Sequence, residues 1–422
     1  MRVFNAILAA LAMLPAAARA QESTAAIAML QKALPPCALN CMVELIPRST
    51  CDLTNTTCIC TNAPLNEQLG ICVLGGCTVP ESLVMKNVSL TMCGAEVRDN
   101  TDLPYYIAIV GSAVTTFFVF LRLFLVFMPG GKRPGWEDGL IVLCLALCLV
   151  PGGLSGPFKE NGLGRDLWYL KPEQITNILR FYFIGEIAYL QGMGILKIAI
   201  LLFLLAIFPD KTFRKSVYVT IGLCVAYCIT FLVATIFQCT PVSYSWTQWD
   251  SLHEGTCNNI HLQAWMSAII NIVLDVIVMV LPLRQILNLK MNWKKKASVL
   301  SMFLVGTVVL VVSIVRLQSL IQFSNSTNIS WDYVPSSYWS ILELDIGIIC
   351  ACMPSVRGLI LRYFPKALST RMTKGSHGYS NGLGSDNKFS RNRAPSGLSK
   401  SDFIPLVNVH TTEGGIRREL DA

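Results

Sequence analysis

Seven long runs of apolar residues follow one another between residues 105 and 361, and short polar segments separate them. Each run is close to the roughly 20 residues that a helix needs to cross the hydrocarbon core of a bilayer. Because a backbone inside a bilayer must satisfy its own hydrogen bonds, we expect each run to be a transmembrane helix. The predicted spans are Tyr105–Met128, Trp136–Pro157, Ile178–Phe208, Val217–Cys239, Ala264–Leu283, Ala297–Phe323 and Tyr338–Leu361. The second span is short and glycine-rich, so a bundle of six spans is the alternative.

The segment before the spans has a different pattern. Residues 1–20 combine Arg2, a short apolar stretch and the small-x-small site Ala18-Arg19-Ala20, which is typical of a cleaved secretory signal peptide. An N-terminal anchor helix is the alternative. A signal peptide would deliver the following segment to an oxidising compartment.

Eight of the sixteen cysteines lie between residues 37 and 93. They are Cys37, Cys41, Cys51, Cys58, Cys60, Cys72, Cys77 and Cys93. In a short secreted segment, eight cysteines indicate four disulfides, which stabilise a domain too small to bury a large core. Zinc binding is the competing interpretation, but this segment contains no histidine, so we predict no metal site. Eight cysteines can form four disulfides in 105 ways, and spacing alone does not choose among them.

The loops between the spans carry an uneven distribution of basic residues. With the cysteine-rich segment outside, the predicted inner loops contain Lys132, Arg133, Lys211, Arg214, Lys215, Arg284, Lys290, Lys294, Lys295 and Lys296. The predicted outer loops 240–263 and 324–337 contain no Lys or Arg. This bias follows the positive-inside rule, and the run at 294–296 also suggests contact with anionic lipid.

Four glycosylation sequons give a second test of topology. They begin at Asn55, Asn87, Asn325 and Asn328, and all four fall on predicted outer segments, where glycans are added. We therefore expect a plasma-membrane protein with an extracellular N-terminus and a cytoplasmic C-terminus. The four predicted regions are a signal peptide (1–20), a cysteine-rich extracellular domain (21–98), a seven-helix domain (104–365) and a disordered cytoplasmic tail (366–422).

Composition and charge exclude other classes of protein. Hydrophobic residues make up 53% of the chain and charged residues only 14%, against about 25% in soluble domains. The net charge of +8 is spread over short runs between apolar segments, which argues against nucleic-acid binding. The four histidines do not cluster and no nucleophile motif is present, so we do not expect an enzyme.

The cysteine-rich segment resembles the fungal CFEM domain. The residues that carry the resemblance are Pro36-Cys37-Ala38-Leu39-Asn40-Cys41, Cys51, Cys58-Ile59-Cys60, Cys72, Cys77 and Cys93. The resemblance implies the disulfides Cys37–Cys77, Cys41–Cys72, Cys51–Cys58 and Cys60–Cys93. In haem-binding members of that family, an aspartate four residues after the third cysteine ligates iron. Here that position holds Asn55, so we expect no cofactor, and haem binding is weak or absent.

The membrane part resembles the fungal rhodopsin-like domain of receptors linked to pathogenicity. The likeness rests on Phe237-Gln238-Cys239-Thr240-Pro241, Trp246, Gly255-Thr256-Cys257, Lys197-Ile198-Ala199-Ile200-Leu201-Leu202-Phe203, Pro282-Leu283, Arg316-Leu317 and Ile349-Cys350-Ala351-Cys352-Met353-Pro354-Ser355-Val356-Arg357. It implies a G-protein-coupled type of receptor, with a heterotrimeric G protein as a possible partner. The seventh span contains no lysine that could bind retinal. Cys239 and Cys257 are the two cysteines on the predicted outer side of the helical domain, so we expect a disulfide between them.

Charged residues inside the predicted spans are costly and therefore informative. They are Glu186, Lys197, Asp275, Arg316, Glu343 and Asp345. Glu186 and Lys197 lie eleven residues apart, about 16 Å along a helix, so they cannot pair with each other. Lys197 with Asp275 is one expected pair. A structural interhelical network, a ligand or activation switch, and an ion pathway are the open interpretations.

The sequence therefore predicts an all-α membrane protein, a seven-transmembrane helix bundle with a small disulfide-rich helical extracellular domain. A receptor for an extracellular ligand that we cannot name is the first functional hypothesis. A transporter is the second, although no internal repeat is visible. A surface protein that handles haem or iron is the third.

Overall fold

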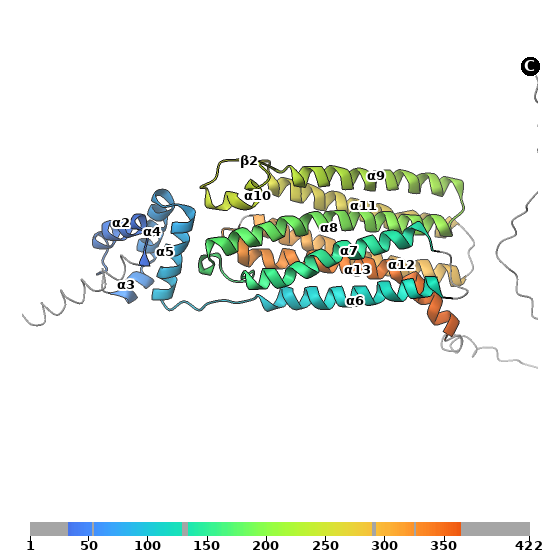
Figure 1. Ribbon diagram of the computed structural model, residues 1–422, viewed down its shortest axis with the longest axis horizontal. Helices are drawn as coiled ribbons and strands as arrows, with labels where there is room; N and C mark the ends of the chain where they lie inside the picture. Colours follow the sequence, from blue (N-terminus) through green and yellow to red (C-terminus); the bar gives the residue numbers. More distant parts are fainter. Residues whose placement is uncertain (1–32, 53–54, 129–133, 289–292, 325, 364–422) are drawn as a thin grey trace, which may run out of the picture. The chain divides into compact units, whose positions relative to one another are not determined.

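The computed structural model describes residues 33–363, with gaps at 53–54, 129–133, 289–292 and 325. The predicted signal peptide and the predicted tail lie outside the described residues, as does Asn325. Within the described part, a cysteine-rich group of short helices precedes seven long helices (Figure 1). The predicted all-α class, with a disulfide-rich domain before a helical membrane domain, is confirmed.

The cysteine-rich domain consists of short helices whose ends are set by proline and asparagine. Its elements are α2 (Pro36–Leu45), η1 (Ile46–Arg48), α3 (Thr56–Thr61), α4 (Ala63–Gly76) and α5 (Val79–Met92). Proline occupies the first turn of α2, α4 and α5, where its missing N–H costs nothing. The core is small and includes Leu34, Ala38, Met42, Ile46, Leu65, Leu69, Val73 and Met85. So small a core leaves much of the stability to the disulfides.

The membrane domain is built from helices that extend beyond the predicted spans at most of their ends. They are α6 (Asp102–Phe127), α7 (Trp136–Glu160), α8 (Pro172–Ile207), α9 (Lys211–Ile236), α11 (Ile260–Asn288), α12 (Trp293–Ser324) and α13 (Ile329–Tyr363). The second predicted span is a continuous helix, α7, although it contains Pro151 and Pro157. Proline inside a membrane helix is tolerated because neighbouring groups satisfy the freed carbonyl.

Six of the described helices are long and apolar enough to cross a membrane. The remaining long helix, α12, has a shorter apolar stretch, Gly306–Gln322, among the residues described. Large apolar side chains also cover outward-facing positions of α6, where Phe117, Phe120 and Phe127 are more than half exposed. Exposed phenylalanine side chains along one helix are expected where that helix faces lipid.

Helix α8 lies at the centre of the bundle and packs against α7, α9, α11 and α13 (Figure 1). Small residues allow close approach at its contacts. A Cβ atom on Gly194 would lie 2.2 Å from Cys228 Sγ on α9, so any larger residue there would require Cys228 to move. Cys144, Cys148 and Cys224 are fully buried in the same core, as expected for small packing residues.

The segment between α9 and α11 is held by a short antiparallel pair. Strand β1 (Cys239–Thr240) pairs with β2 (Thr256–Cys257), and α10 (Tyr244–Thr247) and η3 (Gln248–Asp250) lie between them. Cys239 and Cys257 are direct partners in this pair and form a disulfide. The loop is therefore closed at the end of α9.

Candidate functional site

Four disulfides hold the cysteine-rich domain together. The bonds are Cys37–Cys77, Cys41–Cys72, Cys51–Cys58 and Cys60–Cys93, the same pairs that the family resemblance implies. Glu81 lies near Cys37 and Cys77 in a group with metal-like spacing. Both sulfurs belong to a disulfide, however, and a disulfide offers no thiolate to a metal.

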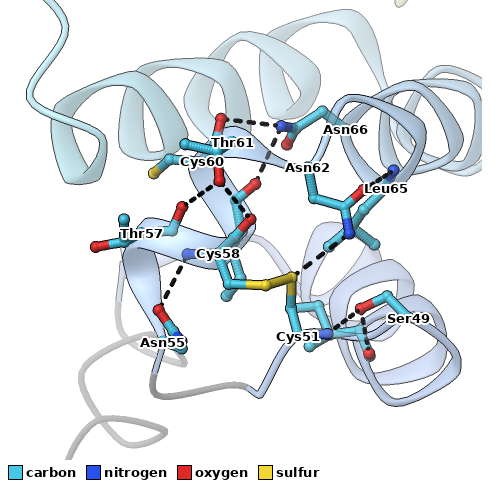
Figure 2. Close-up of a disulfide and its surroundings, with 12 residues drawn as sticks. Ser49, Cys51, Asn55, Thr57, Cys58, Cys60, Thr61, Asn62, Leu65 and Asn66 are labelled. Carbon is cyan, nitrogen blue, oxygen red and sulfur yellow. Dashed lines mark hydrogen bonds between the residues drawn. A yellow bond between two sulfur atoms is a disulfide. The ribbon is translucent and has the colours of Figure 1, made fainter.

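Asn55 has a structural task next to the Cys51–Cys58 disulfide. Its Oδ1 accepts a hydrogen bond from the backbone N–H of Cys58 at 3.0 Å, so it caps the N-terminus of α3 (Figure 2). Asn62 caps α4 in the same way by accepting from the Leu65 N–H at 3.2 Å. Cys58 and Cys60, which form the disulfides with Cys51 and Cys93, both lie on α3, the helix that Asn55 caps.

The residues around this position do not fit haem iron. The side chain at the family's iron-ligating position is a neutral amide whose oxygen already accepts a hydrogen bond from Cys58 N–H. Met42 and Met85, which could offer a thioether, are buried in the domain core. No histidine lies in the described part of the domain.

The charged residues of the bundle meet around Glu343 on α13. Arg316 Nε of α12 lies 2.7 Å from Glu343 Oε2, and the Tyr189 hydroxyl of α8 donates to the same oxygen at 2.6 Å. Asn271 of α11 donates to Glu343 Oε1 at 3.0 Å, and Ser313 of α12 also donates to it. Glu343 is fully buried, and these donors replace the water that it has lost.

Lys197 joins the same network from α8. Its Nζ lies 3.0 Å from Asp275 Oδ1 on α11 and donates to Asn271 Oδ1 at 2.7 Å. Asn271 thus connects the Lys197–Asp275 pair to the Arg316–Glu343 pair. Polar side chains from α8, α11, α12 and α13 form one continuous buried network.

Two of the expected residues stand outside this network. Asp345 accepts hydrogen bonds from Thr115 at 2.6 Å and from Cys148 at 3.1 Å. Glu186 has a buried Oε2 with no hydrogen-bond partner among the described residues.

Sequence reasoning missed one buried pair. Arg122 of α6 binds Asp138 of α7 through Nε at 2.9 Å and Nη2 at 2.7 Å, and its Nη1 donates to the Ala351 carbonyl at 2.6 Å. The available signal was that Arg122 is the one charge in its span, and a lone buried cation requires a partner. Asp138 was not recognised because it lies in the first turn of α7, where acidic residues are common.

The sequons differ in accessibility. Asn55 is exposed, and its cap uses only Oδ1. Asn87 is partly exposed on α5 and accepts from the Thr91 hydroxyl. The expectation of a glycan at Asn328 conflicts with the structure. Its amide nitrogen, the atom that would carry the glycan, is buried and donates to Asp166 Oδ1 at 2.7 Å.

Comparison with known proteins matches both parts of the chain. Residues 30–94 match the CFEM domain, and residues 119–362 match the fungal rhodopsin domain. A SAT4 family membrane protein of Emericella nidulans is 26% identical over 58% of this chain and 60% of its own length. Receptor GIN3 of Arthrobotrys oligospora is 24% identical over 63% of this chain and 64% of its own length.

The chain thus spans less than two thirds of the length of these relatives. No solved structure matches it significantly. The fungal rhodopsin domain match covers more than half of the chain. The protein belongs to the fungal rhodopsin domain family and is a receptor-like membrane protein that carries an N-terminal CFEM domain.

Proposed function

We propose that this protein is a cell-surface receptor of the G-protein-coupled type, which senses an extracellular cue and signals to the cytoplasm. In this proposal the CFEM domain faces the outside of the plasma membrane and the C-terminus faces the cytoplasm. The charge bias of the loops supports that orientation. A heterotrimeric G protein is the proposed partner, and no catalytic activity is proposed.

One observation carries the proposal. The buried network of Lys197, Asn271, Asp275, Arg316 and Glu343 links four helices in the interior of the bundle. A receptor needs helices that move relative to one another between two arrangements. Hydrogen-bonded ion pairs between helices are suited to this, because a small helix displacement exchanges one partner for another.

Basic residues at the N-terminal end of α9 support the proposed direction of signalling. Lys211, Arg214 and Lys215 lie on the first turns of α9 and line a shallow surface depression with Tyr218. Basic residues at this end suit a membrane surface with anionic lipids and an acidic cytoplasmic partner. The run at 294–296 belongs to α12, but its side chains are outside those that the structure describes.

Lys197→Met tests the proposal. This change leaves Asp275 without its cation, so we expect altered cyclic-nucleotide output in cells while protein still reaches the surface. Lys171→Met is the control, because Lys171 is exposed at the N-cap position just before α8. Normal output from a surface-delivered Lys197→Met variant, or solute flux through the protein in liposomes, would contradict the receptor mechanism.

A further inference from the structure

The bundle contains a cavity whose α8 wall is formed by residues that precede Lys197 in the sequence. It is bounded by six helices, including the first turns of α6, the last turns of α7 and the first half of α13. Its volume is about 80 Å³. A water molecule needs roughly 10–15 Å³ by this measure, so the cavity has room for several waters or a small ligand.

Glu186 points to the chemistry of the ligand. It lines the cavity, and its Oε2 is buried without a hydrogen-bond partner among the described residues. Glu343, Asp275 and Asp138 in the bundle interior each contact a cation. Asp345 Oδ2 also has no hydrogen-bond partner among the described residues, but Asp345 does not line this cavity, and its Oδ1 accepts from Thr115 and Cys148. A buried carboxylate oxygen without a partner is unfavourable, so Glu186 Oε2 is a strong acceptor that the protein itself leaves unused at this cavity.

The cations that line the cavity are already neutralised. Arg316 attracts Glu186 from a distance, but its ion pair is with Glu343, at 2.7 Å. Lys159 Nζ lies 2.6 Å from Asp102 Oδ1. Glu186 is therefore the one charge in the described lining that no direct ion pair balances, and the cavity favours a cationic guest.

Aromatic rings beside Glu186 fit the same guest. Tyr182 and Tyr333 both line the cavity, and their ring centroids are 4.5 Å apart in an edge-to-face arrangement. Tyr189 contributes a third ring, and the Arg316 guanidinium already lies over it, with Cζ 4.7 Å from the ring centroid. Aromatic faces attract ammonium groups, and the apolar Leu190, Ile341 and Leu344 can contact the rest of a ligand.

We infer that this cavity binds a small organic cation, an amine with an apolar body, whose ammonium group is held by Glu186. The inference rests on the proposed receptor function only in that the bound amine would be the receptor's ligand. The ammonium would donate to the unpartnered Oε2, next to the Tyr182 and Tyr333 rings. Arg316 also lines this cavity and pairs with Glu343. A bound ligand would therefore contact a member of the buried network directly.

The test measures binding to the full chain in lipid nanodiscs by titration calorimetry. The probes are butylamine, 2-phenylethylamine and tryptamine, each paired with the alcohol that replaces its amine. We expect at least one amine to bind tenfold or more tightly than its alcohol. Glu186→Gln should remove that preference, whereas Glu173→Gln, at an exposed position of the same helix, should keep it.

Three results would overturn the inference. They are the absence of binding by all three amines, equal binding of amine and alcohol to the unmodified protein, and an unchanged preference in folded Glu186→Gln. The amine-to-alcohol ratio of the unmodified protein needs no variant, so the test holds even if Glu186→Gln does not fold. Amine binding without any change in cellular output would contradict the receptor function and leave the site intact. Cellular output in response to another cue, with no amine binding, would overturn the amine site and leave the receptor function standing.

Discussion

Arg316 and Glu343 form an ion pair between α12 and α13, with 2.7 Å between Nε and Oε2 and side chains that are 5% and 0% exposed. Tyr189 contacts both members of the pair, because the Arg316 guanidinium lies over its ring and its hydroxyl donates to Glu343. The pair thus also contacts α8 through Tyr189 and α11 through Asn271, which donates to Glu343 Oε1.

Removal of one member of this pair should destabilise the bundle. We expect Arg316→Met to lower the free energy of unfolding by about 3–5 kcal/mol, because Glu343 is then buried without a cation. Thermal unfolding of the purified protein in detergent measures the change. The double variant Arg316→Met with Glu343→Gln should recover part of the loss, and a purely additive loss would show that the two residues do not act as a pair.

The missed pair of Arg122 and Asp138 should behave in the same way at another place in the bundle. We expect Arg122→Met to cost about 3–5 kcal/mol, because both side chains are almost fully buried. Surface delivery and thermal unfolding are the measurements. Arg180→Met, at an exposed position of α8, serves as the control and should change little.

The Cys239–Cys257 disulfide should stabilise the loop that connects α9 to α11. It closes a segment with a sequence separation of 18, for which loop-closure entropy predicts about 3 kcal/mol. Replacement of both cysteines by serine should therefore lower Tm and increase proteolysis within 240–256. Cys350→Ser and Cys352→Ser together provide a control that removes two cysteines without a disulfide. Unchanged proteolysis of the loop would argue against its closure by this bond.

Asn55→Asp should preserve the cap of α3 and change the chemistry at the family's iron-ligating position. A carboxylate accepts the Cys58 N–H as an amide does, and it also offers an anionic ligand to iron. We expect a Soret band on addition of haem to the Asn55→Asp chain and little or none with the unmodified chain. Tight, stoichiometric binding by the unmodified chain would refute this expectation. Asn62→Asp, which alters the cap of α4, controls for added charge.

The CFEM domain should lose stability at acidic pH through Glu81. The backbone N–H of Thr78 donates to Glu81 Oε2 at 2.9 Å, and the Thr78 hydroxyl donates to the same oxygen at 2.8 Å. These hydrogen bonds, the backbone one most, lower the pKa of Glu81 from its ordinary 4.5. A carboxylate with a lowered folded-state pKa adds stability above its unfolded pKa, and this is lost as pH falls through the folded value. Protection of the amides at the start of α5 against hydrogen exchange, taken relative to the intrinsic rate at each pH, should therefore fall below about pH 4.5. Glu81→Gln should flatten that dependence, and an equal pH response in both proteins would contradict the assignment.

The sequence by itself determined the class of this protein, because each relevant signal is local. Runs of about 20 apolar residues predict spans whatever lies beside them, and α7 formed despite its two prolines because a membrane helix has no competing partner for its backbone. The eight cysteines of residues 37–93 identified a crosslinked domain by their density. Their pairing came from the family resemblance, since spacing allows many connectivities.

Only the tertiary structure decided which buried charges meet. Side chains on different helices come together through helix rotation and order, neither of which a hydrophobic run specifies. Lys197 with Asp275 could be guessed, but the hub at Glu343, the bridge through Asn271 and the Arg122–Asp138 pair depend on how α8, α11, α12 and α13, and separately α6 and α7, face each other. The isolation of Glu186 beside a cavity is likewise a property of packing, because an unused acceptor is recognised only once its neighbours are in place.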